Sequence, residues 1–272
     1  MISDQEFTRI ASFLKGKYGI DMTDKKIIMN GRLENFVWSH GYASFTEFMN
    51  ALEADPTGGL EKTLVNLLTT NHTFFMRESE HFDFMKSEVI PWIKEREAVT
   101  RDMRIWCGAA SSGEEPYGLA MLLMDVLGLE ANKWDTTVLA TDISEDALRK
   151  AMAGEYEEEQ VGVLPDYWRR RYFRQVAGTT KYRVTDELKS KVLYRKFNLM
   201  NPFPFRKPMH VIFMRNVMIY FDEPTKKELI NKIYDMLLPG GYLFVGRTET
   251  LDRDNTDFEM VQPSIFRRPL DS

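Results

Sequence analysis

The sequence contains one cysteine, Cys107, among its 272 residues. A lone cysteine cannot form an internal disulfide, so the chain is not a disulfide-stapled scaffold and suits a reducing compartment. Long apolar runs are also missing, since no stretch approaches the roughly 20 residues that a membrane-spanning helix needs. The first residues lack the basic start and apolar centre of a signal peptide. We therefore expect a cytoplasmic protein that is not inserted in a membrane.

Positive charge is not in excess either, because 36 Lys and Arg stand against 41 Asp and Glu, for a formal net charge of -5. An acidic chain has no general attraction for phosphates, so no nucleic-acid partner is expected. Histidine is scarce, and His72, His81 and His210 are scattered along the sequence. With a single cysteine, this predicts no metal site.

The first 75 residues carry the pattern of a helical domain. Phe7, Ile10 and Leu14 recur at helical spacing. Three further helices are expected, over residues 25–39, 44–54 and 59–69. Such a bundle either docks a partner or serves as a lid or scaffold for the rest of the chain, and the sequence leaves both open.

From residue 80 onward, short apolar strands alternate with helices. The expected strands cover residues 103–107, 137–140, 192–196, 209–214 and 242–246, with a last one at 264–267. Repeated strand–helix units predict an α/β fold, in which an open, mostly parallel sheet is covered on both faces. We assign residues 76–272 to this domain, whose ligands should bind beyond the carboxyl ends of the strands.

One segment interrupts this alternation of strands and helices. The period-two pattern over residues 172–184 predicts a small antiparallel hairpin. We therefore expect a small inserted antiparallel β-subdomain over about residues 168–193.

A run of small residues, Gly108 to Gly113, follows the first expected strand. Small residues let a ligand approach the backbone closely, but the run lacks the Gly-Lys-Ser/Thr ending of a triphosphate-binding loop. Glu114 and Glu115 open the next helix, where they either complement the helix dipole or face a ligand. Two acids would repel a pyrophosphate but not the cationic tail of S-adenosylmethionine. They therefore favour S-adenosylmethionine over a nicotinamide dinucleotide.

Polar residues also follow the next three strands. Asp142 stands where an acid commonly accepts hydrogen bonds from ribose hydroxyls, although it could instead supply charge at the start of the helix that Ser144 caps. Asn198 and Asn216 end two further strands. There an asparagine reads the adenine edge, holds the methionine tail or caps its own turn.

Six motifs resemble those of the chemotaxis receptor methyltransferases of the CheR type, in the same order. They are TTNHTFFMRE (69–78), GAASSGEEPYGLA (108–120), ATDISEDAL (140–148), NLMNPF (198–203), FMRNVMIYFD (213–222) and LLPGGYLFVGRTE (237–249). The resemblance implies a helical N-terminal domain and a Rossmann-like methyltransferase domain with an inserted β-subdomain. It also implies methyl transfer from S-adenosylmethionine to glutamate side chains of chemoreceptors, giving methyl esters and S-adenosylhomocysteine.

The resemblance further implies the residues of the site. By motif position, the cofactor contacts are Asn71, Thr73, Arg77, Glu114, Glu115, Asp142, Asn198, Leu199, Asn216 and Val217. Which of the two adjacent glutamates touches the cofactor stays open. Arg77 and Tyr220 match the active-site arginine and tyrosine. A glutamate carboxylate is ionised at neutral pH and needs no general base, so Arg77 is expected to position it and Tyr220 to donate a hydrogen bond or close the pocket.

The implied partner is the cytoplasmic domain of chemoreceptors, and a monomer is expected because nothing in the sequence indicates an obligate oligomer. Some relatives bind a receptor pentapeptide tether through a glycine-rich loop of the β-subdomain. Here that segment, QVAGTTKYRV, has only Gly178, which predicts independence from the tether.

Two other functions are weighed: an amino-group methyltransferase acting on nucleic acid, and a non-catalytic signalling module that binds S-adenosylmethionine. The first usually carries Asn-Pro-Pro-aromatic where this chain has RNVMIY.

Overall fold

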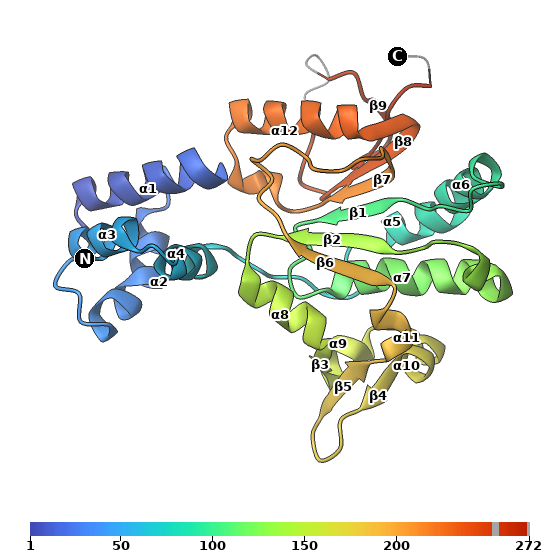
Figure 1. Cartoon of the computed structure of the whole chain (residues 1–272), viewed down its shortest axis with the longest axis horizontal. Helices are drawn as coiled ribbons and strands as arrows, with labels where there is room; N and C mark the ends of the chain where they lie inside the picture. Colours follow the sequence, from blue (N-terminus) through green and yellow to red (C-terminus); the bar gives the residue numbers. More distant parts are fainter. Residues whose placement is uncertain (252–255, 271–272) are drawn as a thin grey trace.

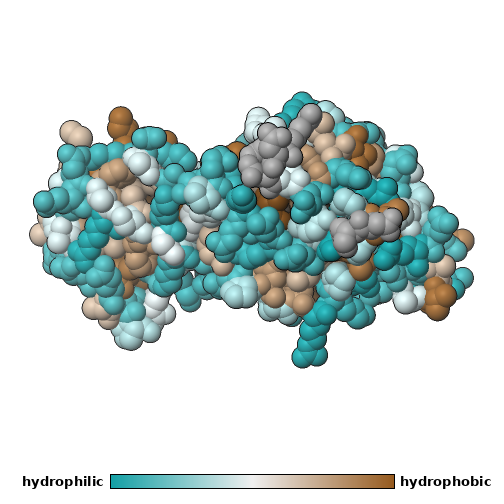
Figure 2. All heavy atoms as spheres, turned by 90° about the horizontal axis from the view of Figure 1, so that it is seen from above, coloured by the Kyte–Doolittle hydropathy of each residue, from teal (hydrophilic) through white to brown (hydrophobic). Residues whose placement is uncertain are grey.

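The computed structural model describes residues 1–251 and 256–270. Its N-terminal part is a helical bundle of α1 (Asp4–Tyr18), α2 (Lys26–Ser39), α3 (Phe45–Ala54) and α4 (Gly59–Leu68). α1 begins with a capping box between Ser3 and Glu6 and ends at Gly19, which adopts a φ of 70°. Figure 2 shows the bundle as a smaller lobe joined to the rest of the molecule through a narrower waist.

A central sheet forms the core of the larger lobe (Figure 1). In spatial order, its strands within the described residues are β6 (Val192–Lys196), β2 (Val138–Asp142), β1 (Ile105–Gly108), β7 (Met209–Met214), β8 (Leu237–Val245), β10 (Ile265–Arg267) and β9 (Glu259–Gln262). The first five are parallel, whereas β10 runs antiparallel to β8 and β9 antiparallel to β10. The expected α/β, Rossmann-like sheet is confirmed, with β9 as an additional strand.

Helices cover the sheet on both faces. They are α5 (Ser79–Phe84), α6 (Ile90–Arg96), α7 (Glu114–Leu127), α8 (Glu145–Ala153) and α12 (Glu223–Met236), with the shorter η1 (Met85–Val89), η2 (Gly128–Lys133) and η3 (Met218–Tyr220). Ile105 and Cys107 of β1 pack in a core with α5, α6 and α7, whereas Trp106 packs in a second core on the other face. That second core contains α12 and continues into the N-terminal bundle. The two lobes are therefore joined by packed apolar side chains, not by a linker alone.

The inserted β-subdomain lies between α8 and β6 and projects from the larger lobe (Figure 1). Its antiparallel strands follow the order β3 (Glu155–Glu157), β5 (Lys181–Val184) and β4 (Phe173–Gln175), with the helices α9 (Glu158–Gly162), α10 (Asp166–Tyr172) and α11 (Asp186–Lys189). The expected range of 168–193 contains the β4–β5 hairpin but omits β3 and α9. The difference arises because β3 has only three residues, too few for an alternating pattern to show in the sequence.

No helix within the described ranges is both long enough and apolar enough to cross a bilayer. Nor do these ranges bring three or more His, Cys, Asp or Glu side chains together in a way that could hold a metal ion.

Candidate functional site

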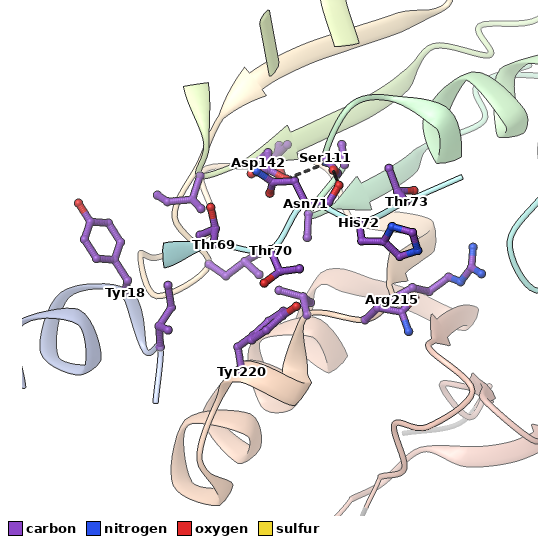
Figure 3. Close-up of a pocket in the computed structure, with 18 of the residues that line it drawn as sticks. Tyr18, Thr69, Thr70, Asn71, His72, Thr73, Ser111, Asp142, Arg215 and Tyr220 are labelled. Atoms are coloured by element: carbon purple, nitrogen blue, oxygen red, sulfur yellow. Dashed lines mark hydrogen bonds between the residues drawn. The ribbon is translucent and has the colours of Figure 1, made fainter. Parts of the chain in front are cut away.

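A cleft opens where the carboxyl ends of β1, β2, β6 and β7 face the N-terminal bundle (Figure 3). Ten of the expected site residues line it: Asn71, Thr73, Arg77, Glu115, Asp142, Asn198, Leu199, Asn216, Val217 and Tyr220. The lining also includes Ser111 of the small-residue run, and residues that the sequence did not single out, among them Tyr18, Ile20, Phe197 and Arg215. Parallel strands bring all these segments together because their carboxyl ends meet at one edge of the sheet.

The small-residue loop after β1 is held in an unusual backbone conformation. Ala109 and Ser111 have φ values of 61° and 49°, and Gly113 has a φ of 98°. The Ser111 amide donates to Asp142 Oδ2 at 2.8 Å, and the Ser144 amide donates to Asp142 Oδ1 at 2.8 Å. Burial raises the pKa of Asp142, and these backbone amides oppose that rise. Asp142 therefore fixes the loop from the cleft side, and each of its oxygens keeps a lone pair for a further donor.

Arg215 is a charged residue of the cleft that sequence reasoning missed. It follows β7 directly, and its side chain is only 2% exposed. Its guanidinium forms ion pairs with Glu115 and Glu78 and donates to the backbone carbonyl of Arg77. Its buried Nε has no hydrogen-bond partner within the described residues. A charge placed immediately after a fully buried strand was the signal that could have identified it.

Glu115, beside Arg215, is the glutamate of the pair that faces the cleft. Its Oε1 accepts from the thiol of Cys107 at 2.9 Å, and its Oε2 accepts from Arg215. Glu114, which was also expected to contact the cofactor, lies elsewhere in the structure. Glu114 is 1% exposed and accepts from Ser112 Oγ and Gln160 Nε2, so it lies outside the cleft lining. The reason is that neighbouring helix residues point about 100° apart, so only one of them can face the ligand side.

Arg77 lies in a tight turn between α4 and α5. Met76 and Glu78 on either side of it have φ values of 58° and 54°. Its Nη1 donates to the His72 carbonyl at 3.1 Å, and its guanidinium carbon lies 5.7 Å from the centre of the Phe74 ring. No carboxylate pairs with it within residues 1–251 and 256–270. Its positive charge is therefore available to an anion in the cleft.

Tyr220 lies in η3, in a segment that a second missed residue, Glu249, holds in place. The Glu249 carboxylate accepts from the amides of Asn216 and Met218, each at 2.7 Å, and of Gly246 at 2.6 Å. Asn216 has a φ of 56°, so this segment needs such support. Burial raises the pKa of Glu249, and the backbone amides oppose that rise. The Tyr220 hydroxyl forms no hydrogen bond to another described residue.

The N-terminal bundle completes the cleft at the chain segment after α1. The amide of Asp21 donates to the Tyr220 carbonyl at 2.8 Å, and Ile20 forms an antiparallel bridge with Phe221. Asn198 Nδ2 donates to the Lys17 carbonyl at 2.8 Å, while its Oδ1 accepts from the Met200 amide at 3.0 Å. The Asn198 side chain thus supports the junction of the two lobes from within the cleft lining.

The charges of the cleft suit a ligand with a cationic centre, an anionic end and a ribose. Glu115 and Asp142 supply carboxylates, and Arg215 supplies a buried cation whose Nε lacks a partner among the described residues. An orphaned buried N–H is costly unless a ligand satisfies it. S-adenosylmethionine, with its sulfonium, ammonium, carboxylate and ribose, fits this set of groups.

Comparison with known proteins agrees with this geometry. The family model of the CheR methyltransferase all-alpha domain matches residues 5–69, and that of the CheR methyltransferase SAM binding domain matches residues 71–266. The chain is 37% identical over 272 residues to a chemotaxis protein methyltransferase of Borreliella burgdorferi, covering 98% of this chain and 95% of that protein. It is 34% identical over 269 residues to the chemotaxis protein methyltransferase of Escherichia coli, covering 97% and 91%. The chain therefore belongs to the CheR family of methyltransferases, whose cofactor is S-adenosylmethionine.

Proposed function

We propose that the chain methylates glutamate side chains of chemoreceptors, giving glutamyl methyl esters. The observation that carries this proposal is Arg77, a cation in the cleft lining with no carboxylate partner among the described residues. A planar guanidinium binds a carboxylate through two parallel hydrogen bonds. The relatives are named chemotaxis protein methyltransferases, which supports a receptor as the source of that carboxylate.

The residues of the cleft divide between holding the cofactor and holding the substrate. Arg215 Nε and Glu115 would hold the amino-acid end of S-adenosylmethionine, and Asp142 would accept from its ribose hydroxyls. The Leu199 amide donates to no described residue, so it is available to the adenine edge. Asn71, Thr73, Asn216 and Val217 line the same space and complete the proposed cofactor contacts.

When bound, S-adenosylmethionine would supply an activated methyl group, which the substrate carboxylate would take as a new C–O bond while the electron pair of the C–S bond leaves on sulfur. The protein's part is alignment, because a glutamate carboxylate is already ionised at neutral pH. Arg77 holds the incoming carboxylate and excludes other orientations. Tyr220 donates a hydrogen bond from its hydroxyl or closes the cleft over the reacting groups.

The decisive assay is transfer of a tritiated methyl group to receptor-containing membranes, followed by base-labile release of methanol. Arg77→Ala should abolish transfer, whereas S-adenosylhomocysteine should still bind at least weakly in calorimetry. Arg149→Ala, which removes an exposed arginine of α8, is the matched control and should transfer at the normal rate. Unchanged turnover in Arg77→Ala would contradict the proposed role. Absence of transfer in the unmodified chain, with normal cofactor binding, would favour a non-catalytic signalling module.

The proposed reaction is independent of a receptor tether, and the chain acts as a monomer. The loop between β4 and β5 supports the first point, because it is a short turn in which the Thr179 amide donates to the Val176 carbonyl at 3.1 Å. Calorimetry with a receptor C-terminal pentapeptide tests it, and micromolar binding would contradict it. Light scattering coupled to size exclusion tests the monomer.

A further inference from the structure

The inserted β-subdomain contacts the small-residue loop after β1 (Gly108 to Gly113, called the cofactor loop from here on) through Tyr156. Tyr156 is the middle residue of β3 and is 3% exposed. Its hydroxyl donates to the backbone carbonyl of Ser112 at 2.8 Å, within the loop that lines the cleft. Its ring also packs edge-on against Phe75, with ring centres 4.9 Å apart. One side chain of the subdomain therefore touches both the cofactor loop and the segment that carries Arg77.

A second contact joins the same two regions through Glu114. Gln160, in α9 of the subdomain, donates from Nε2 to Glu114 Oε1 at 3.3 Å. Glu114 Oε2 in turn accepts from the hydroxyl of Ser112 at 2.7 Å. The inserted subdomain therefore contacts Ser112 twice: Tyr156 binds its backbone carbonyl directly, and Gln160 reaches its hydroxyl through Glu114.

The cofactor loop needs support of this kind. Ala109 and Ser111 adopt positive φ, a conformation that is unfavourable for non-glycine residues and persists only when the surroundings impose it. From the cleft side, Asp142 holds the Ser111 amide. Around Gly113 the packing is close: a β-carbon there would lie 3.0 Å from the Tyr156 hydroxyl and 2.8 Å from that of Tyr194, and neither tyrosine lines the cleft.

We propose that the inserted subdomain braces the cofactor loop, and that Tyr156 is a positioning residue for S-adenosylmethionine. It acts through the Ser112 carbonyl and the Phe75 ring and touches no reacting atom. The subdomain then has a role within the enzyme, independent of any partner on its outer face. Cofactor affinity becomes a property that the subdomain helps to set.

The test is binding of S-adenosylhomocysteine to Tyr156→Phe by calorimetry. This substitution keeps the ring and removes only the hydrogen bond to the loop. One hydrogen bond predicts a Kd raised about 3- to 10-fold. With methyl-transfer kinetics, KM for S-adenosylmethionine should rise by a similar factor while kcat stays within about twofold.

Two matched variants separate positioning from general loss of stability. Tyr117→Phe removes another buried hydroxyl, which donates to the Ala151 carbonyl at 2.8 Å and not to the Ser112 carbonyl, while the remaining ring keeps its edge-on contacts with Tyr156 and Tyr194. It should lower the melting temperature as much as Tyr156→Phe while leaving the Kd unchanged. Tyr172→Phe removes a buried hydroxyl that has no hydrogen-bond partner within the described chain, and it should change neither quantity.

Gln160→Ala provides an independent variant at an exposed position of α9. It should raise the Kd about twofold, because it removes the indirect contact through Glu114 and also the bond that Gln160 Oε1 accepts from the Glu157 amide at 3.0 Å, at the start of α9. A wild-type Kd in Tyr156→Phe would overturn the proposal, whatever the Kd of Gln160→Ala. An equal rise of the Kd in Tyr117→Phe would also overturn it, since the effect would then be general destabilisation.

Discussion

Replacing Glu249 by glutamine tests whether this buried carboxylate holds the Asn216–Tyr220 segment in place. Glu249 accepts four backbone hydrogen bonds: Oε1 from Met218 and Ile219, and Oε2 from Gly246 and Asn216. In Glu249→Gln one oxygen becomes an NH2 group, which cannot accept. Two backbone amides then face a donor, and each buried unsatisfied group costs about 1–3 kcal/mol. We expect the free energy of unfolding to fall by about 2–6 kcal/mol, with a melting temperature lower by roughly 4–24 °C.

The same substitution should also weaken cofactor binding, because Asn216 and Val217 line the cleft. Calorimetry with S-adenosylhomocysteine should show a Kd raised at least about 10-fold. Glu259→Gln, at an exposed position in β9, is the control and should leave both stability and Kd unchanged. A Glu249→Gln protein that melts and binds like the original chain would refute the assignment, because the backbone amides would then need no acceptor there.

Three further substitutions probe other parts of the cleft and its supports. Arg215→Lys keeps the charge but loses the planar fork that spans Glu115 and Glu78, so S-adenosylhomocysteine should bind at least about 10-fold more weakly in calorimetry; equal affinity would exclude Arg215 from cofactor binding. Burial lowers the pKa of His81 from 6.5 to about 4. As the pH falls from 6.5 to 4, the unfolded chain therefore takes up a proton at this residue that the native chain does not. The free energy of unfolding should fall by roughly 2–4 kcal/mol over that range. Urea unfolding of His81→Gln should show a flatter pH dependence in that window, and parallel curves would contradict the reasoning. The hydrogen bond with Lys15 lowers the pKa of Asp222 to about 2, so this residue contributes stability above pH 4 that is lost as the pH falls toward 2. Asp222→Asn keeps the cap of α12. In urea unfolding, its free energy of unfolding should be lower than that of the original chain by less than about 1 kcal/mol at pH 7, and the difference should vanish near pH 2.

The elements that the sequence predicted well are those whose signals are local. Ser144 accepts from the amide of Ala147 as the expected helix cap. β7 (Met209–Met214) was found at its observed bounds because six apolar or buried residues follow one another. β9 was missed because all four of its residues are exposed, so no apolar face marks it. α5, η1 and α6 form one uninterrupted helical run, whose middle part η1 is π-helical just before Pro91, which has no amide hydrogen to donate.

The missed residues of the site share a different cause. Arg215 and Glu249 act through partners that are distant in sequence: Arg215 on Glu115, 100 residues away, and Glu249 on Asn216, 33 residues away. Neither pairing can be seen until the sheet brings the strand ends together. Asp142, by contrast, could be identified because its position after a strand has a known ligand chemistry.

The two adjacent glutamates show most directly where sequence reasoning stops. Choosing between Glu114 and Glu115 requires knowing which side of α7 faces the cleft, and a helix normally reveals this through its apolar stripe. α7 has no such stripe, because every residue from Pro116 to Met124 is buried. The sheet packs on one side of the helix, and α11 of the inserted subdomain packs on another. The subdomain that removes the periodicity of α7 also supplies Gln160, which holds Glu114 away from the cleft. Predicting which glutamate meets the cofactor therefore depends on first placing the insertion, and three-residue β3 leaves too faint a pattern for that.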